Sequence, residues 1–144
     1  NYELIASEND RVFNYENRIY RPFMTDQLLL KQLMTILFDN AIKYTEEDGE
    51  IEFVVYATDR HLYLTVTDNG IGISAADKKK IFDRFYRVDK ARTRQKGGFG
   101  LGLSLAKQIV DALRGTIAVK DNKPRGTIFE VKIAIQSPSK RKNK

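Results

Sequence analysis

The chain has 144 residues, 42% of them hydrophobic, which is the size and apolar content of a single globular domain. The absence of cysteine and the single histidine exclude a disulfide framework and a thiolate metal site, and they argue against a zinc cluster. The net charge of +6 is weak evidence for nucleic-acid binding, because the tail over 140–144 supplies four of these charges. No apolar run reaches the ~18 residues of a membrane-spanning helix and no signal peptide is visible, so we expect a reducing, cytoplasmic environment.

The first half of the chain is predicted to contain a long helix and three strands. "VFNYENRIY" alternates loosely and indicates an edge strand or a hairpin. Thr25 or Asp26 can cap a helix over 26–44, in which apolar residues recur at helical spacing. "EEDGE" is a turn, and the segments "IEFVVYAT" and "HLYLTVT" predict a hairpin joined around Asp59 and Arg60. One face of the helix carries Leu29, Leu33, Ile36 and Leu37.

The second half alternates short helices with strands. "SAADKKKIFDRFY" predicts a short helix capped by Ser74, and residues 87–98 are basic without periodicity. A glycine-rich segment then opens a helix that runs to Arg114 and stops at Gly115. "TIAVK" and "GTIFEVKIAI" are the last strands. The order of elements predicts an α/β (α+β) two-layer sandwich, with a mixed, mostly antiparallel sheet and about three helices on one face.

Two polar residues at strand ends fall in phase with the apolar face of the sheet. Asp68 shares a face with Leu62, Leu64 and Val66, and Thr127 is in phase with the apolar residues that follow it. A buried carboxylate costs several kcal/mol unless hydrogen-bond donors serve it. Asp68 is therefore a candidate ligand-binding group, although an aspartate that caps a turn formed with Asn69 and Gly70 would have the same sequence.

The end of the long helix repeats this pattern. Asn40 follows Ile36 by four residues, and Lys43 and Tyr44 lie three and four residues after Asn40 on the same side. Three polar or amphipathic side chains on one helical face indicate a binding surface, while a solvated last helical turn is the alternative.

Six of the nine glycines lie in two clusters, "NGIG" and "GGFGLG". A glycine-rich turn that opens a helix offers free N–H groups and the positive end of the helix dipole, which suits phosphate; a loop without a ligand is the alternative. The segment before the second cluster holds basic residues, including Arg84 and Arg87, which predicts a cationic flap beside an anion site. The second glycine cluster is not a P-loop, since Leu103 and Ser104 follow the glycines where that motif needs Lys-Ser/Thr.

Four blocks in this order resemble the catalytic and ATP-binding domain of bacterial two-component sensor histidine kinases, within the wider gyrase-type and heat-shock chaperone ATPase superfamily. "ILFDNAIKYT" is similar to their N box, "DNGIGI" to the first glycine box, "IFDRFYRVD" to the F box and "GGFGLGLSLAKQIV" to the second glycine box. "GTIFEVKI" is similar to the closing strand, and the match spans roughly residues 25 to 135. The F box and "NAIKYT" favour the kinase branch.

The resemblance implies an ATP pocket between the two layers. Asp68 would accept a hydrogen bond from the adenine amino group, with Thr127 acting through a water, and guanine would be rejected because it presents a carbonyl there. Asn40 would ligate Mg²⁺ that bridges the phosphates, and Lys43 and lid arginines such as Arg87 would contact phosphates. We assign the catalytic roles to Asn40, Lys43 and Arg87, with Asn40 as the metal ligand. The implied ATP-binding set is Asn40, Lys43, Tyr44, Asp68, Gly70, Gly72, Ile73, Gly98, Gly100, Leu101, Gly102, Leu103 and Thr127.

This sequence departs from the family pattern at one position of the N box, and it has no histidine that resembles the family's phosphoacceptor. The family's N box often carries a second asparagine four residues before the first, where this chain has Ile36. The phosphoacceptor histidine of such kinases lies on a dimerisation helix, whereas His61 stands at a strand start and is interpreted as a surface residue. We therefore expect the acceptor in an upstream segment that this chain does not include.

The predicted function is an ATP-dependent protein-histidine kinase domain in two-component signalling. It would bind Mg-ATP, phosphorylate a histidine on a dimerisation helix of its full-length protein and so feed a response regulator; no nucleic-acid partner is expected. The alternatives are a nucleotide-gated non-catalytic module and an anti-sigma-type serine kinase. We expect one domain over 1–136 with an ATP lid over 84–100, a basic disordered tail over 137–144, and a location on the cytoplasmic side of a membrane-anchored parent.

Overall fold

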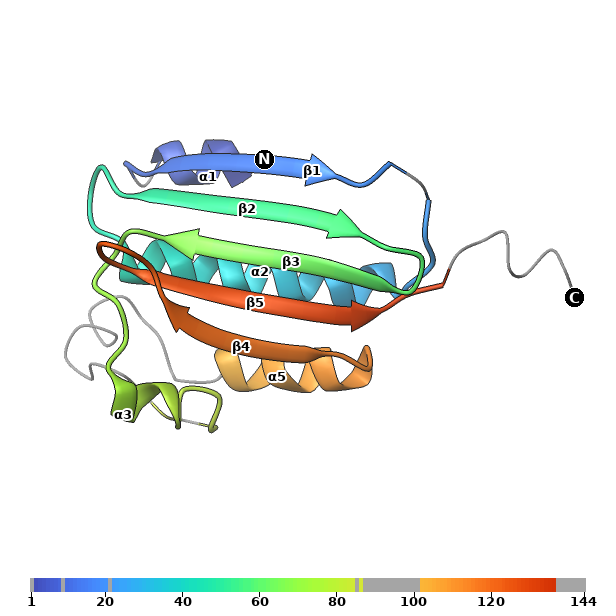
Figure 1. Cartoon of the computed structure of the whole chain (residues 1–144). Coiled ribbons are helices and arrows are strands. Elements are labelled where there is room, and N and C mark those ends of the chain that lie inside the picture. Colours follow the sequence, from blue (N-terminus) through green and yellow to red (C-terminus); the bar gives the residue numbers. More distant parts are fainter. Residues whose placement is uncertain (1, 9, 21, 85, 87–101, 137–144) are drawn as a thin grey trace, which may run out of the picture.

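The structure, a computed structural model, describes residues 2–8, 10–20, 22–84, 86 and 102–136 (Figure 1). Its centre is a sheet with the strand order β1-β2-β3-β5-β4. The strands are β1 (Val12–Arg18), β2 (Glu50–Ala57), β3 (His61–Asp68), β4 (Thr116–Asp121) and β5 (Thr127–Ala134). All neighbouring pairs are antiparallel except β1 and β2, which are parallel. The sheet is therefore mixed and mostly antiparallel, as predicted, and β1 is an edge strand rather than half of a hairpin.

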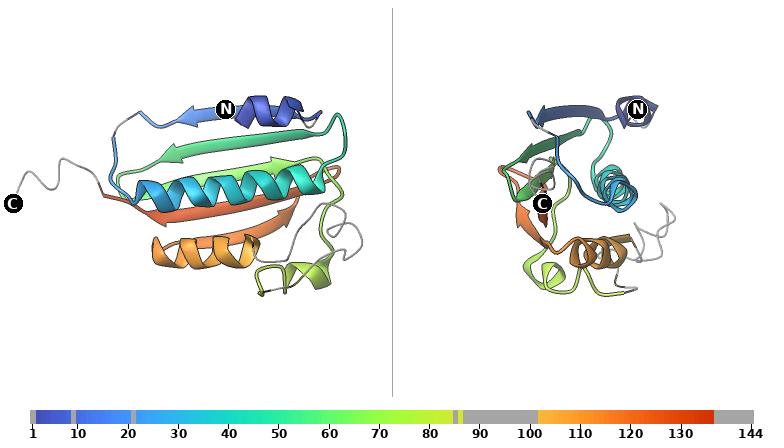
Figure 2. Two further views of the ribbon diagram at one scale, coloured as in Figure 1. Left: turned by 180° about the vertical axis from the view of Figure 1, so that it is seen from behind. Right: turned by 90° about the vertical axis from the view of Figure 1, so that its right-hand side faces the viewer.

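The helices α1 (Tyr2–Glu8), α2 (Gln27–Tyr44) and α5 (Gly102–Ala112) lie on one face of the sheet (Figure 2). This arrangement confirms the two-layer sandwich. The core fills the space between the layers, and it includes the inward-facing residues Leu62, Leu64 and Val66 of β3, all at most 2% exposed. Leu33 and Leu37 of α2 are fully buried, whereas Leu29 and Ile36 are only partly buried. The buried stripe of α2 is thus shifted around the helix from the predicted face, towards Phe38 and Ala41.

The start of α2 is capped as predicted. Asp26 is extended at φ −74° and ψ 104°, and its side chain accepts a hydrogen bond from the backbone N–H of Leu29 at 3.0 Å. A carboxylate in this position satisfies one of the unpaired N–H groups of the first helical turn. Of the two candidate caps, Asp26 and not Thr25 therefore sets where the helix begins.

The helix predicted over 74–86 is much shorter in the structure. Ser74 caps it, but α3 spans only Ala75–Lys78. Beyond it the backbone bonds join residues three apart, from Lys80 N to Asp77 O and from Asp83 N to Lys80 O, both at 2.9 Å. Such bonds form tight turns rather than an α-helix.

The end of α5 also differs from the prediction in its detail. The residue with a left-handed backbone is Arg114, at φ 57°, and not Gly115. The N–H of Gly115 reaches back to Val110 O at 2.9 Å and that of Arg114 to Asp111 O at 3.0 Å, which is the Schellman pattern. Gly115 is needed for another reason, because a Cβ at that position would collide with the carbonyl oxygen of Lys132 on β5.

Candidate nucleotide-binding site

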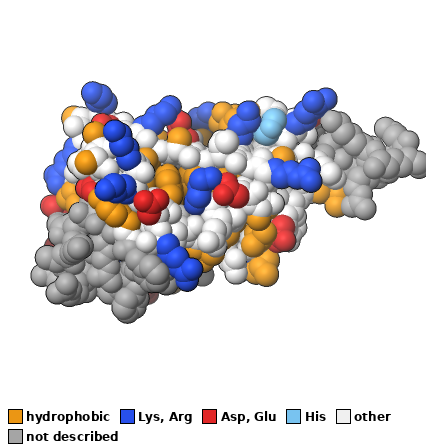
Figure 3. Space-filling view, turned by 90° about the horizontal axis from the view of Figure 1, so that it is seen from below, with side chains coloured by type: hydrophobic (Ala, Val, Ile, Leu, Met, Phe, Trp, Pro, Cys, Tyr) orange, Lys and Arg blue, Asp and Glu red, His pale blue; other side chains and the backbone are white. Residues whose placement is uncertain are grey.

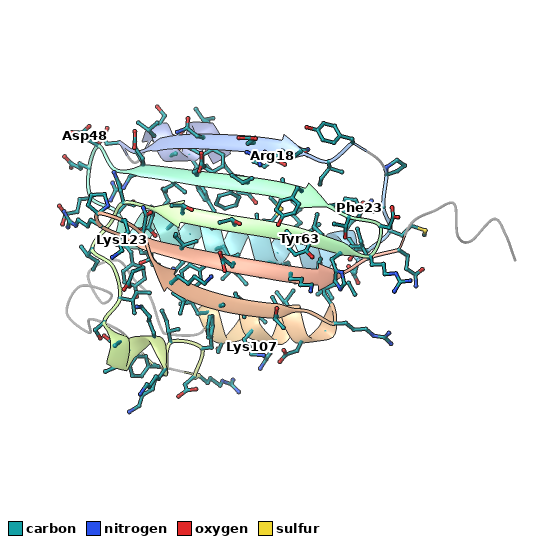
Figure 4. All side chains as sticks on the ribbon, viewed as in Figure 1. Arg18, Phe23, Asp48, Tyr63, Lys107 and Lys123 are labelled. Atoms are coloured by element: carbon teal, nitrogen blue, oxygen red, sulfur yellow. The ribbon has the colours of Figure 1, made fainter. Side chains whose placement is uncertain are left out.

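Those predicted site residues that the structure describes lie at one end of the sandwich. The end of α2, the end of β3, the start of β5 and the start of α5 all lie at the left of Figure 1. Lys123, which follows β4, and Asp48, which precedes β2, mark the same end in Figure 4. Tyr63 lies away from this end, nearer the start of β3. Residues from four elements that are distant in sequence are thereby brought together.

Asp68 and Thr127 face each other across this end of the sheet. They are paired in register between β3 and β5, and each is 2% exposed. The Asp68 carboxylate accepts hydrogen bonds from the backbone N–H of Gly70 at 2.9 Å and of Thr127 at 3.3 Å. The predicted burial of both residues is confirmed and the turn with Gly70 exists, while ligand binding by Asp68 stays a prediction.

The Asp68 carboxylate has acceptor capacity to spare. Both of its hydrogen bonds from described residues end on Oδ1, which leaves Oδ2 for a further donor. Burial raises the pKa of Asp68 above its ordinary value, and the two backbone donors oppose this increase. The hydroxyl of Thr127 is buried and has no hydrogen-bond partner among the described residues. Buried polar groups are rarely left unpaired, so this pair of groups is suited to a polar ligand or an ordered water.

The glycine loop after Asp68 is packed tightly against the end of α2. The N–H of Ile71 donates to the carbonyl oxygen of Tyr44 at 3.0 Å. A Cβ at Gly70 would collide with that same carbonyl, so only glycine fits. Gly72 has a left-handed backbone at φ 77°, and Ile73 is 7% exposed. Of the predicted residues of this loop, Gly70 is therefore positioned by the helix that carries Asn40, whereas Gly72 lies nearest Gly126.

The three predicted binding residues of α2 differ in how deeply they are buried. Asn40 and Lys43 are half-buried, and Tyr44 is 6% exposed. Tyr44 belongs to the buried stripe with Leu37, whereas Asn40 lies at its edge beside Ile36. An amide at the edge of a buried stripe can reach a ligand without being enclosed in the core.

The start of α5 lies beside α2. A Cβ on Gly102 would lie 3.7 Å from Cγ2 of Ile36, and Leu103 packs partly buried against the core. Ile36, the residue at the family's second-asparagine position, therefore faces the opening turn of α5. Four of the predicted site residues, Arg87, Gly98, Gly100 and Leu101, lie outside the described residues, and so does most of the predicted lid and the whole tail over 137–144.

Asn122 is a site-supporting residue that sequence reasoning missed. Its side-chain Nδ2 donates to the backbone carbonyl of Asp68 at 2.9 Å, from the turn that joins β4 and β5. That contact spans 54 residues of sequence, and no local pattern marks it. An asparagine in the turn "DNKPRG" signals only the turn itself.

An open groove of about 510 Å³ lies next to this end of the sheet. It is lined by the segments 71–74 and 121–126, which include Gly72 and Ile73. Neither Asp68 nor Asn40 lines it, so this groove is not the predicted pocket between the layers. That pocket stays a prediction.

His61 lies at the opposite end of β3 from Asp68. The two residues are the first and last of an eight-residue strand, so they are separated by about 23 Å at the usual rise per residue. The side chain is half-buried and visible at the surface in Figure 3, where basic side chains are scattered among apolar and acidic ones. The interpretation of His61 as a surface residue of a hairpin is therefore confirmed, with the side chain half-buried.

Within the described segments, no three His, Cys, Asp or Glu side chains come close enough to hold a metal ion together. None of the helices in the described part of the chain has the length and hydrophobicity that crossing a bilayer requires.

Comparisons with known proteins agree on one family. Residues 25–137 match the model of the histidine kinase-, DNA gyrase B-, and HSP90-like ATPases. The chain is 83% identical over 142 residues to the sensor protein CiaH of Streptococcus pneumoniae serotype 4, covering 99% of this chain and 32% of CiaH. It is 45% identical over 104 residues to the sensor histidine kinase WalK of Bacillus subtilis, covering 71% of this chain and 17% of WalK.

Solved structures give the same result. The mycobacterial sensor histidine kinase MprB superposes with a TM-score of 0.75 at 26% identity, covering 94% of this chain and 90% of that one. The histidine kinase ThkA, in a complex with the response regulator protein TrrA, superposes with a TM-score of 0.73 at 25% identity, covering 97% and 38%. The chain spans about a third of the length of CiaH. It belongs to the histidine kinase-, DNA gyrase B-, and HSP90-like ATPase family, and the proteins that it resembles include sensor histidine kinases.

Proposed function

We propose that this chain binds Mg-ATP and donates the γ-phosphate to a histidine on a dimerisation helix of its full-length protein. A response regulator then receives the phosphoryl group. The observation that carries the proposal is the buried pair Asp68 and Thr127, which has unused hydrogen-bonding capacity at the end of the sheet where the family motifs meet. The relatives named as sensor kinases support a parent that is anchored in the membrane, with this domain on the cytoplasmic side.

The chemistry of the pair suits adenine. Oδ2 of Asp68 is an acceptor for the exocyclic amino group, and the Thr127 hydroxyl can bind a water that contacts the ring. Guanine carries a carbonyl at the corresponding position, so two acceptors would face each other and one buried group would be left unpaired. Sites that hydrogen-bond a substrate group reject analogues that lack it far more strongly than apolar pockets do. We therefore expect ATP to be preferred over GTP.

The phosphate end of the nucleotide would lie towards α2. Asn40 offers a hard amide oxygen, which fits Mg²⁺, since this ion keeps several waters and substrate oxygens and needs few protein ligands. Bound there, Mg²⁺ would neutralise charge on the phosphates. Lys43, three residues further along the same helix, supplies a positive charge for them. Phosphoryl transfer depends mainly on such positioning and charge neutralisation.

The phosphoacceptor is proposed to lie outside this chain. His61 is at the far end of β3 from Asp68, and this separation supports an acceptor histidine outside the chain. The complex of ThkA with the response regulator TrrA supports a partner of the same class here. CiaH, at 83% identity, is about three times as long as this chain, which supports a parent with room for a helical domain.

The test is transfer of labelled phosphate. The domain is incubated with γ-labelled Mg-ATP and the purified dimerisation domain of the parent protein, and label on the acceptor histidine is measured. We expect acid-labile label on the helical domain, and none when its histidine is replaced by glutamine. Nucleotide binding without any transfer to that domain would contradict the kinase proposal.

Ile36 favours one alternative, a module that binds nucleotide without catalysing transfer. It replaces an amide ligand with an aliphatic side chain beside the start of α5. Titration of ATP with and without Mg²⁺ separates the two functions. A kinase requires affinity or transfer that depends on Mg²⁺, whereas indifference to the ion together with no transfer would identify the non-catalytic module.

A further inference from the structure

The C-terminal end of α2 is completed by residues from two distant segments. The last carbonyl groups of a helix have no partners inside the helix and must find them elsewhere. Thr45, fully buried and extended, ends the helix, and its N–H and hydroxyl both donate to Ala41 O, at 3.0 and 2.9 Å. The carbonyl groups of residues 42, 44 and 45 are each paired outside the helix.

Arg11 provides the first of these outside partners. Its Nε donates to the Thr45 hydroxyl at 3.2 Å, and its Nη2 donates to the carbonyl oxygens of Ile42, at 3.4 Å, and Thr45. A guanidinium group suits this position, because its fork serves several acceptors and its charge is favourable at the negative end of a helix dipole. The backbone around it is fixed as well, with Arg11 N bonded to Ala6 O at 2.8 Å and Asp48 N to Asp10 O at 2.7 Å.

The glycine loop provides the second partner. Ile71 N donates to Tyr44 O at 3.0 Å, and Gly70 approaches the same carbonyl so closely that no side chain would fit. Gly70 N in turn donates to the carboxylate of Asp68. A shift of the helix end would therefore move the loop, and the loop would move the donor that orients the adenine-binding carboxylate.

Arg11 lies outside the part of the chain that matches the family model, which begins at residue 25. It lies between α1 and β1, immediately before the first residue of β1. We infer that Arg11 is a positioning residue for the nucleotide site: by holding the end of α2, it keeps the Gly70–Ile71 loop in the geometry that ATP needs. This inference rests on the proposed function and concerns the same site.

The experiment compares Arg11→Ala and Arg11→Lys with wild type, in the full chain. ATP affinity is measured by calorimetry, Tm by thermal unfolding, and the hydrogen exchange of the Ile71 amide by NMR. Val55→Ala is the control, because Val55 is 3% exposed in the core of β2 and lies towards the other end of that strand. This variant should lower Tm through a cavity at a position remote from the start of β2.

We expect Arg11→Ala to weaken ATP binding about tenfold, which is the loss of affinity expected when hydrogen bonds from a charged donor are removed. Ile71 exchange should become faster in that variant, while Val55→Ala keeps affinity within about twofold. Arg11→Lys should have an intermediate ATP affinity, because a lysine keeps the positive charge but lacks the several donors of the guanidinium group.

Unchanged ATP affinity and unchanged Ile71 exchange in Arg11→Ala, with a lowered Tm, would overturn the inference and leave Arg11 a purely structural residue. Absence of ATP binding by wild type is a separate result. It would overturn the proposed function itself, and the exchange measurement would then show whether Arg11 still controls the loop.

Discussion

Replacing Asp68 with asparagine separates the ligand-binding role of this residue from its place in the fold. Asparagine has nearly the same shape, and its amide oxygen can accept the same two backbone hydrogen bonds, from Gly70 and Thr127. The other position, Oδ2 of the carboxylate, becomes an NH₂ group. An acceptor that would face the adenine amino group is thereby replaced by a donor.

The expected loss of ATP affinity follows from that exchange. Removing a hydrogen bond to a charged group costs roughly 1.5–3 kcal/mol. That corresponds to a reduction on the order of 10- to 100-fold in affinity, and opposed donors add to it. Discrimination against GTP should shrink at the same time, because the unpaired-acceptor penalty for guanine disappears with the carboxylate.

The stability of this variant should not fall along with its ATP affinity. Burial raises the pKa of Asp68, so the folded state holds this proton more tightly than the unfolded chain does. The free energy of unfolding therefore falls as pH rises from the ordinary carboxyl pKa through the raised folded value, and it stays lower above that window. Asp68→Asn removes this term. The Tm of the variant should therefore equal or exceed that of wild type at neutral pH, and the difference should shrink in acid.

Calorimetric titration with ATP and GTP, together with thermal unfolding across the acid range, tests both expectations. Asp111→Asn, at an exposed residue of α5, is the matched control and should change neither result. Full ATP affinity in Asp68→Asn would refute the adenine assignment. A large loss of Tm at neutral pH would refute the argument that the ionised carboxylate destabilises the fold.

Three further substitutions test other parts of the site. Thr127→Val removes a buried hydroxyl that has no partner among the described residues, so calorimetry should show ATP affinity falling several-fold while Tm stays equal or rises; a clear loss of Tm would count against it. Asn40→Ala should abolish the Mg²⁺ dependence of ATP binding with a change of no more than about 1 kcal/mol in the free energy of unfolding, and retained Mg²⁺ dependence would disprove the ligand assignment. Gly70→Ala places a Cβ against the Tyr44 carbonyl and should lower the free energy of unfolding by about 2 kcal/mol or more, so a Tm equal to wild type would contradict the close packing of the loop.

Most of the fold was predictable because its signals are local. Period-two alternation in β3 and β5 assigned Asp68 and Thr127 to the buried face, and the strand register then brought them opposite each other. Helical spacing gave α2, and a side-chain cap at Asp26 marked its start. In each case a few neighbouring residues carry the information.

The contacts that support the candidate site were not predictable, because they join residues that are far apart in the sequence. The bonds from Arg11 to Thr45 and from Asn122 to Asp68 join residues 34 and 54 positions apart, and each depends on how separate elements pack. The predicted length of the helix over 74–86 was wrong: only Ala75–Lys78 is helical, and tertiary contacts hold Ile81 and Phe82 in the turns that follow. Ile81 is 3% exposed, and Phe82 meets Phe129 of β5 with ring centroids 6.3 Å apart.

Two features that reduce stability lie at the end of the sandwich that carries Asp68, and the packed core beside them offsets their cost. Asp68 is a buried carboxylate and Thr127 a buried, unpartnered hydroxyl, and each lowers stability unless a ligand completes it. Rings from α1, β1, α2 and β2 pack together in one aromatic cluster, Tyr2, Phe13, Phe38 and Phe53, with centroid separations between 4.6 and 6.1 Å. Two of these elements, α1 and β1, precede the family match, so the upstream segment contributes both to the core and, through Arg11, to the end of α2. Deleting that segment should therefore lower both Tm and ATP affinity, whereas Asp68→Asn should lower affinity alone.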